Sequence, residues 1–250
     1  MTLGQVMSHS AGLKVTDLLK DFQMIYDFKN VSQSLVQFVD EPLLSEPGTQ
    51  YNYSNYGYQV VGAIIESVIN DEYFNAINKM FEELKMNSTF CETSDMIIRH
   101  RVHDYLKSDY PILPDPTRNA SEVHLMNALV IDDLLAMEAQ WPAGEYLKSS
   151  TVKQIWDPVI EKFRNKYGLS KEAHGWAVTE LDRPIVCQNK CQMPSTISRF
   201  IWKTGGLTGV TNILMILPDQ DIIVALLTNT SDVQDDIVEA ALMVAKEFMN

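Results

Sequence analysis

Apolar side chains in the first half of the chain recur every three or four residues, which is the spacing of one helix face. The clearest case predicts a helix over 54–70, and a shorter amphipathic helix is expected over 74–84. Residues 4–38 are mostly helical in character, 132–140 is expected to be helical, and prolines make 86–120 irregular. The expected apolar stripe of the 54–70 helix consists of Tyr56, Val60, Val61, Ile64, Ile65 and Val68.

The second half changes to short apolar runs, which are typical of strands. We expect strands over 176–178, 200–204, 211–217 and 221–228. The last two are joined by Pro218-Asp219-Gln220, a turn-like link that predicts an antiparallel hairpin.

A helix is expected to close the chain. Ser231 is placed to be its N-cap with Gln234 three residues later, which is the spacing of a capping box, and Asp232 adds negative charge to the first turn. Helices early, antiparallel strands late and a terminal helix over the sheet predict a mixed α/β (α+β) architecture. The expected buried stripe of this helix is Val233, Ile237, Ala241, Val244 and Phe248.

Composition and charge exclude several classes of protein. The chain has 250 residues and a formal net charge of −13 without a Lys/Arg cluster, so nucleic-acid and anionic-membrane binding are disfavoured. The longest apolar runs, 213–217 and 222–227, are far shorter than the roughly 20 residues of a membrane-spanning helix. We expect a single domain over 1–250, with a helical lobe at about 1–172 and the sheet strands and last helix at about 173–250.

Three segments stand out as candidates for chemistry, and their order is more specific than any one of them alone. The first, at 8–13, is Ser-His-Ser-Ala-Gly-Leu. The second, at 47–66, begins with Pro-Gly and contains the triplet Tyr53-Ser54-Asn55 ahead of the predicted helix. The third is Lys203-Thr204-Gly205-Gly206, which is followed by two apolar strands.

These segments resemble the serine β-lactamase and penicillin-binding-protein superfamily, in its class C and esterase-like branch. The resemblance covers nearly the whole chain and is weakest at about 104–147. It implies a β-lactamase/transpeptidase-like fold, in which an antiparallel sheet is flanked by helices and joined by a mostly helical lobe. Within that branch the chain is similar to mitochondrial members from animals, which implies a mitochondrial location and a role tied to lipid metabolism, although Met1–Gln5 does not look like a targeting segment.

The resemblance also implies roles for individual residues in an acyl-enzyme mechanism. Tyr53 would belong to the proton relay, and Asn55 would hold the substrate and a lysine. Lys203 would place positive charge beside Tyr53 and favour its phenolate form. The glycines would let a substrate lie against the strand edge, and the N–H of Gly206 would be one oxyanion donor. The implied substrate-binding residues are Thr204, Gly205 and Gly206.

The printed sequence departs from the family at its first motif, Ser-x-x-Lys, which carries the nucleophile and a lysine and precedes the Ser-His segment. We therefore expect the chain to lack the nucleophile helix and the leading strands. The Ser-x-x-Lys at Ser150–Lys153 follows Tyr53 instead of preceding it and is interpreted as a chance match. The expected function is a serine hydrolase of peptidase, amidase or esterase type. Residues 1–250 by themselves are expected to be inactive, because the nucleophile motif is absent from them. The alternative is a non-catalytic protein that uses the cleft for binding or self-assembly.

Other candidate sites are weaker. Neighbours such as Ser8 and His9 rarely face each other, so a nucleophile–base pair is not expected there. Two groups of possible metal ligands are not expected to bind a metal. The group with His100 and His103 has no further ligand cluster to support it, and the group with Cys187 and Cys191 offers only three ligands at an unusual spacing. We expect no cofactor, a small-molecule or peptide substrate, and no nucleic acid, and the sequence leaves a homo-oligomer open. The two groups are His100, His103 and Asp104, and His174, Cys187 and Cys191.

Overall fold

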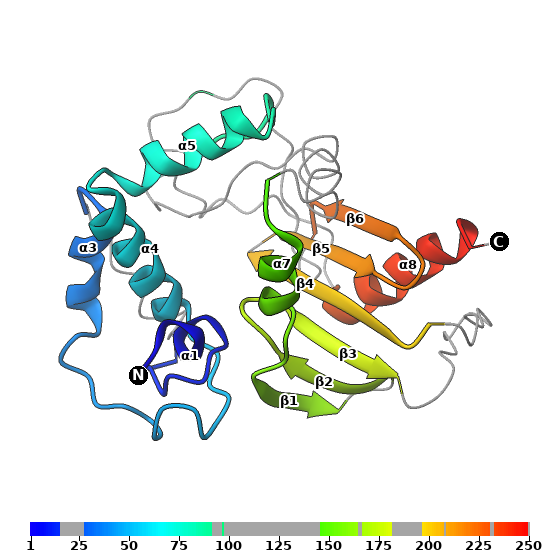
Figure 1. The fold of residues 1–250 in the computed structure, drawn as a ribbon, viewed down its shortest axis with the longest axis horizontal. Helices are drawn as coiled ribbons and strands as arrows, with labels where there is room; N and C mark the ends of the chain where they lie inside the picture. The colour runs from blue at the N-terminus through cyan, green and yellow to red at the C-terminus, as the bar shows by residue number, and fades with distance from the viewer. Residues whose placement is uncertain are drawn as a thin grey trace, which may run out of the picture. The chain divides into compact units, whose positions relative to one another are not determined.

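The computed structural model describes residues 1–15, 28–91, 97, 146–164, 167–181, 197–207, 209–230 and 233–249. The chain divides into two compact units, unit 1 with 1–94, 121–162 and 171–175, and unit 2 with 95–120, 163–170 and 176–250. Its described elements run in the order α1 (Leu3–Met7), α3 (Val31–Ser34), the 3-10 helix η1 (Leu35–Gln37), α4 (Asn55–Ile69), α5 (Tyr73–Glu83), α7 (Ser149–Ile155), β1 (Ile160–Arg164), β2 (Gly168–Glu172), β3 (Ala177–Leu181), β4 (Arg199–Leu207), β5 (Val210–Leu217), β6 (Ile222–Thr228) and α8 (Gln234–Glu247) (Figure 1).

Helix α4 is the centre of unit 1, where it contacts α1, α3 and α5. Both α4 and α5 were predicted by the helix periodicity, and the structure confirms them within one residue at each end. The face that α4 buries is different from the predicted stripe. It contains Tyr56 and two glycines, Gly57 and Gly62, whereas Val68 is 78% exposed.

The glycines explain why the predicted stripe of α4 is only partly confirmed. A Cβ on Gly62 would lie 2.8 Å from Cγ1 of Val31, and one on Gly57 would lie 3.5 Å from Cγ1 of Val6. Helices α3 and α1 therefore approach α4 at positions without a side chain. A hydrophobicity pattern assigns such positions no weight, so it placed the buried face too far toward Ile64 and Val68.

In the described residues of the N-terminal segment, helix is limited to α1 and to α3 with η1. Helix α1 has five residues and ends at Ser8, and His9 and Gly12 then adopt positive φ values of 54° and 74°. This left-handed backbone turns the chain and ends the helix. Farther on, α3 has four residues and continues as η1. The expectations for 16–27, 98–120 and 132–140 lie outside the described residues.

Glu66 of α4 joins three helices of unit 1. Its carboxylate accepts hydrogen bonds from the N–H groups of Val31 (3.0 Å), Ser32 (2.9 Å) and Tyr73 (3.3 Å) and from the Ser32 hydroxyl (2.6 Å). These N–H groups belong to the first turns of α3 and α5, which have no partner within their own helices. Burial of the carboxyl opposes ionisation, but the hydrogen bonds outweigh it and lower the pKa of Glu66.

The strands form one six-stranded sheet in the order β1-β2-β3-β4-β5-β6. The pairs β3–β4, β4–β5 and β5–β6 are antiparallel, and the last is the predicted hairpin. The mixed α/β class with an antiparallel sheet is thereby confirmed. The sequence analysis missed β1 and β2, because their charged residues, such as Lys162 and Glu172, hide the apolar alternation that marks a strand.

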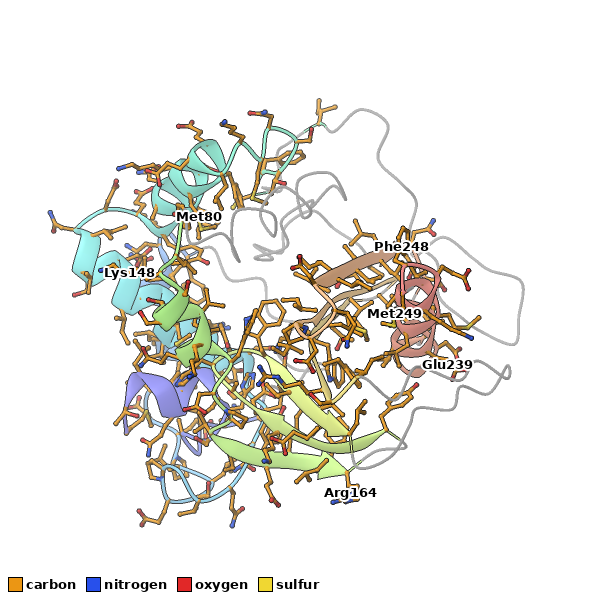
Figure 2. The ribbon with its side chains drawn as sticks, turned by 45° about the vertical axis from the view of Figure 1, so that its right-hand side comes forward. Met80, Lys148, Arg164, Glu239, Phe248 and Met249 are labelled. Carbon is orange, nitrogen blue, oxygen red and sulfur yellow. The ribbon has the colours of Figure 1, made fainter. Side chains whose placement is uncertain are left out.

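Helix α8 lies against β5 and β6 on one face of the sheet (Figure 1). Two details of its prediction were wrong. The helix begins at Gln234 with Val233 as its N-cap, so Ser231 is not the cap, and Ser231 and Asp232 lie outside the described residues. Val244 and Phe248 are exposed, and Figure 2 shows Phe248 at the C-terminal end of α8. The buried face is instead Ile237, Val238, Ala241, Leu242 and Ala245.

The small side chains of Ala241 and Ala245 face the core of unit 2 in place of Phe248. The predicted and observed stripes share Ile237 and Ala241, and they differ in which flank of the helix turns toward the sheet. Periodicity fixes the existence of an apolar face, whereas the shape of the sheet fixes its direction. None of the helices described is long and apolar enough to cross a membrane.

Candidate active site

Tyr53 lies in the loop that leads into α4, and Asn55 is the first residue of that helix. The loop is fixed by its neighbours on both sides of Tyr53. The N–H of Asn52 donates to the carbonyl oxygen of His9 (2.8 Å), and the N–H of Ser54 donates to Nδ1 of His9 (3.2 Å). The Ser54 hydroxyl also donates to the carbonyl oxygen of Lys14 (2.5 Å).

Three tyrosines surround the imidazole of His9, and we call the four residues His9, Tyr51, Tyr53 and Tyr58 the tyrosine cluster. The ring of His9 lies 4.4 Å from that of Tyr53, 5.4 Å from that of Tyr58 and 5.9 Å from that of Tyr51, measured between centroids. The Tyr58 hydroxyl donates to the carbonyl oxygen of Met7 (3.0 Å). A Cβ on Gly175 would lie 2.6 Å from the Tyr58 hydroxyl, so a glycine is needed there.

A buried ion pair belongs to the same part of unit 1. Glu172, at the end of β2, is fully buried, and its Oε2 accepts a hydrogen bond from Nζ of Lys162 on β1 at 2.8 Å. The Lys162 ammonium also lies 5.1 Å from the centroid of the Tyr51 ring, a cation–π distance. A buried carboxylate needs such a partner, because its desolvation costs several kcal/mol (about 3–5 when the pair is broken).

The surroundings of the tyrosines keep their phenols protonated. Burial raises the pKa of Tyr53, and the negative charge of Glu172 raises it further. The same two causes, in the same order, raise the pKa values of Tyr51 and Tyr58. Within unit 1, Tyr53 is therefore a neutral phenol with an O–H to donate. This effect runs opposite to the phenolate that the sequence analysis expected beside Lys203.

Lys203, Thr204, Gly205 and Gly206 lie together on β4 in unit 2, opposite Leu214 to Thr211 of β5. The register of β4 with β3 ends at the pair Trp202–Ala177, one residue before Lys203, whereas its register with β5 continues to Leu207. In the described part of the sheet, the Lys203–Gly206 segment therefore has a strand neighbour on one side. Gly205 and Gly206 are exposed.

Gly205 has a packing role in addition to the expected substrate contact. A Cβ at this position would collide with the side-chain amide of Asn212, the residue paired with Gly205 across β4 and β5. The expected site residues thus fall into two groups, with Tyr53 and Asn55 in unit 1 and Lys203 to Gly206 in unit 2. A contact between the two groups stays a prediction.

The other candidates from the sequence are placed as follows. Ser8 is fully buried, and its Oγ lies 2.9 Å from Oγ of Ser10 and donates to the carbonyl oxygen of Gln5 (3.4 Å). Ser150 and Lys153 are both exposed on α7. Nδ1 of His174 lies 3.1 Å from the carbonyl oxygen of Gln154.

Among the described residues, no group of three or more His, Cys, Asp and Glu side chains is arranged to hold a metal ion. The expectations for His100, His103, Asp104, Cys187 and Cys191 lie outside those residues.

The sequence analysis missed Lys162, Glu172 and Tyr58, and it gave His9 no role in the site. Lys162 and Glu172 stand ten positions apart in strands that were not predicted, and more than 100 positions from the tyrosines. No local pattern links such residues. Tyr58 was overlooked within the helix that contains it, although two other tyrosines, Tyr51 and Tyr53, stand close to it in the sequence.

A comparison with protein families decides the classification of this chain. The sequence model of the family described as Beta-lactamase matches residues 1–247. The chain belongs to the beta-lactamase family. This confirms the resemblance drawn from the three segments, and it brings with it the beta-lactamase/transpeptidase type of fold.

Known members of the beta-lactamase family and related folds give the extent of the similarity. "Serine beta-lactamase-like protein LACTB, mitochondrial" of Mus musculus is 27% identical over 258 residues, which cover 88% of this chain and 44% of the mouse protein. The chain thus spans less than half the length of the curated relatives it matches.

Two solved structures share the fold. The octameric penicillin-binding protein homologue of Pyrococcus abyssi aligns with a TM-score of 0.75 and 18% identity, over 96% of this chain and 54% of that one. The D-amino acid amidase of Ochrobactrum anthropi complexed with L-phenylalanine amide aligns with a TM-score of 0.71 and 18% identity, over 99% of this chain and 72% of that one.

Proposed function

We propose that this chain carries the Tyr-x-Asn and Lys-Thr-Gly parts of a serine hydrolase site that transfers acyl groups from esters, amides or peptides. The observation that carries the proposal is the position of Lys203–Gly206 on β4, directly beyond the end of the β3 register. An extended substrate can pair with such a strand edge through backbone hydrogen bonds. Membership of the beta-lactamase family supports the same reaction class.

The proposed chemistry assigns one role to each residue. A serine oxygen attacks the substrate carbonyl and gives up its proton, an acyl-enzyme forms as the bond to the leaving group breaks, and water then releases the acid. Tyr53, as a neutral phenol, relays the proton in one step: it passes its own proton to the leaving nitrogen or oxygen as it takes up the proton that the serine gives up. Asn55 holds the substrate amide, Lys203 supplies positive charge, and the N–H of Gly206 stabilises the oxyanion.

The position of the serine nucleophile is the first point to test. Residues 1–52 contain no Ser-x-x-Lys, and the Ser-x-x-Lys at Ser150–Lys153 is exposed on α7. Sequencing of the full-length transcript and mass spectrometry of the native protein will give its true N-terminus. An upstream Ser-x-x-Lys supports the hydrolase. A native protein that begins at Met1 contradicts it and favours the non-catalytic alternative.

Activity is tested on the native protein with an activated ester, p-nitrophenyl acetate, and with amino-acid amides. We expect Tyr53→Phe and Lys203→Met each to lower kcat by about 10²- to 10⁴-fold, the range for loss of general acid–base or electrostatic assistance. Ser150→Ala is the matched control and is expected to leave the rate unchanged. Wild-type rates from Tyr53→Phe would contradict the proposal.

The expected location, oligomeric state and biological role of the protein are proposals as well. A mitochondrial location is supported by the name of the mouse relative, and fractionation of the native protein would test it. Assembly into a homo-oligomer is supported by the octameric Pyrococcus abyssi protein, and light scattering would test it. Peptidase activity and a role in lipid metabolism rest on the family resemblance alone.

A further inference from the structure

We infer that His9 is a positioning residue that fixes the Tyr53 side chain for acyl transfer, an inference that rests on the proposed function. His9 belongs to neither of the motifs that carry the proposed chemistry. It precedes Tyr53 by 44 positions and follows α1 directly. Its contacts nevertheless converge on Tyr53 from three directions.

Two of these contacts bind the residues on either side of Tyr53. The carbonyl oxygen of His9 accepts the N–H of Asn52 at 2.8 Å, and its Nδ1 accepts the N–H of Ser54 at 3.2 Å. The backbone of Tyr53 is thus held at both ends by a single residue. A loop pinned in this way has less freedom to displace the tyrosine, and a displacement of about 1 Å can cost 10²-fold in rate.

The third contact is made by the imidazole ring, whose centroid lies 4.4 Å from that of Tyr53 at an interplanar angle of 41°. His9 is 3% exposed. The buried ring therefore packs against the phenol, whereas the two hydrogen bonds fix the path of the backbone and carry most of the positioning. Tyr58 packs against another part of the same ring and is itself tied to Met7 by its hydroxyl.

The hydrogen bond from Ser54 defines the proton state that this role requires. Nδ1 accepts an N–H, so a neutral His9 carries its ring proton on Nε2. A base must take up the proton on a ring nitrogen, whereas Nδ1 of His9 already accepts from Ser54 and Nε2 already carries the ring proton. His9 accordingly acts through Tyr53 and not on the substrate.

The turn around His9 is held by hydrogen bonds of its own. Its φ of +54° is a conformation that costs most residues energy, but it is less rare for His. The N–H of His9 donates to the carbonyl oxygen of Val6 (3.2 Å), and that of Ser10 donates to the carbonyl oxygen of Gln5 (2.8 Å). The Ser10 hydroxyl also donates to the carbonyl oxygen of Gln5 (3.3 Å).

Two variants separate the hydrogen bond from the ring. His9→Asn keeps an acceptor near the position of Nδ1 and tolerates the positive φ, but it removes the ring. His9→Phe keeps a ring and removes the acceptor. We expect His9→Phe to lower kcat on p-nitrophenyl acetate by about 10- to 100-fold with KM changed by less than about threefold, and His9→Asn to recover most of the loss. Circular dichroism melts of the native protein and both variants identify any that fail to fold.

The decisive measurement repeats these variants in a Tyr53→Phe background. If His9 acts through Tyr53, His9→Phe costs no further activity there, because the phenol it positions is gone. An equal loss in both backgrounds overturns the inference and leaves His9 a purely structural role.

Amide hydrogen exchange keeps the inference testable if Tyr53→Phe proves fully active and the proposed function fails. We expect the Ser54 amide to exchange faster in His9→Phe than in His9→Asn, because only Asn offers it an acceptor. Equal exchange in the two variants would show that His9 does not hold the Tyr53 loop, whatever the reaction.

Discussion

The fully buried carboxylate of Glu172 and the ammonium of Lys162 form an ion pair of 2.8 Å next to the tyrosine cluster. The pair links the middle of β1 to the end of β2, and Lys162 also lies over the ring of Tyr51, in the loop that carries Tyr53. Lys162 lies over the ring of Tyr51, whereas burial and, after it, the charge of Glu172 raise the pKa of all three tyrosines. The charge of Glu172 therefore adds to the effect of burial in raising the pKa of Tyr53, the group proposed to relay protons.

Replacing Glu172 with Gln should lower the pKa of Tyr53 and of Tyr58. The carboxylate disfavours a neighbouring phenolate, so its removal makes both phenols easier to ionise, while the amide oxygen still accepts from Lys162. An alkaline titration followed by NMR of ¹³Cζ-labelled tyrosine measures the change. Tyr73 is the control within the same molecule, since burial and Cys91 raise its pKa and Glu172 does not. A shift of Tyr73 as large as that of Tyr53 would refute the local effect.

A chain of buried hydroxyls crosses the sheet of unit 2 just before Lys203. Nε1 of Trp202 donates to Oγ1 of Thr179 (2.9 Å), which lies 2.7 Å from Oγ of Ser170. Thr179→Val removes the hydroxyl that interacts with both Trp202 and Ser170, so these two polar groups each lose that hydrogen bond. We therefore expect a loss of about 1–3 kcal/mol in the free energy of unfolding. Urea denaturation measures this loss.

Thr211→Val provides the matched comparison for Thr179→Val. Thr211 is equally buried, and its hydroxyl has no hydrogen-bond partner in the described part of the chain. Removing that hydroxyl should change the unfolding free energy by less than about 0.5 kcal/mol or stabilise the protein. Equal losses from the two substitutions would contradict the role of the hydroxyl chain.

Glu66→Gln should destabilise the protein at neutral pH by about 1 kcal/mol, the typical value of one helix-capping interaction. The folded-state pKa of Glu66 is lowered from 4.5, so its contribution is present above that value and is lost as the pH falls through the lower folded-state pKa. Wild type and variant should therefore differ in urea denaturation at pH 7, and the difference should shrink as the pH is lowered below 4.5. Glu82→Gln, at an exposed position on α5, is the control. A difference that does not depend on pH would rule out the charge as its cause.

The corrected face of α8 leads to a further expectation. Leu242 is fully buried, and Phe248 is 71% exposed. Leu242→Ala should cost about 2–5 kcal/mol through a cavity, whereas Phe248→Ala should cost less than about 0.5 kcal/mol. Thermal or urea unfolding of both variants tests the assignment, and the reverse order would restore the face that periodicity predicted.

The sequence by itself determined the elements whose signals are local. Periodicity predicted α4, α5, the last four strands and the existence of α8, because the apolar residues of one helix or strand face recur at short intervals along the chain. The family resemblance that it showed is confirmed, whereas the roles that this resemblance implies for Tyr53, Asn55 and Lys203 stay predictions.

Only the tertiary structure decided which faces and charges are buried. The glycines of α4, the alanines of α8 and the ion pair of Lys162 and Glu172 depend on neighbours that are far away in the sequence. The residue type of Glu172 by itself predicts an exposed side chain, because a carboxylate is rarely buried unless a cation lies beside it. His9 gained its place beside Tyr53 for the same reason, through contacts that span more than 40 positions.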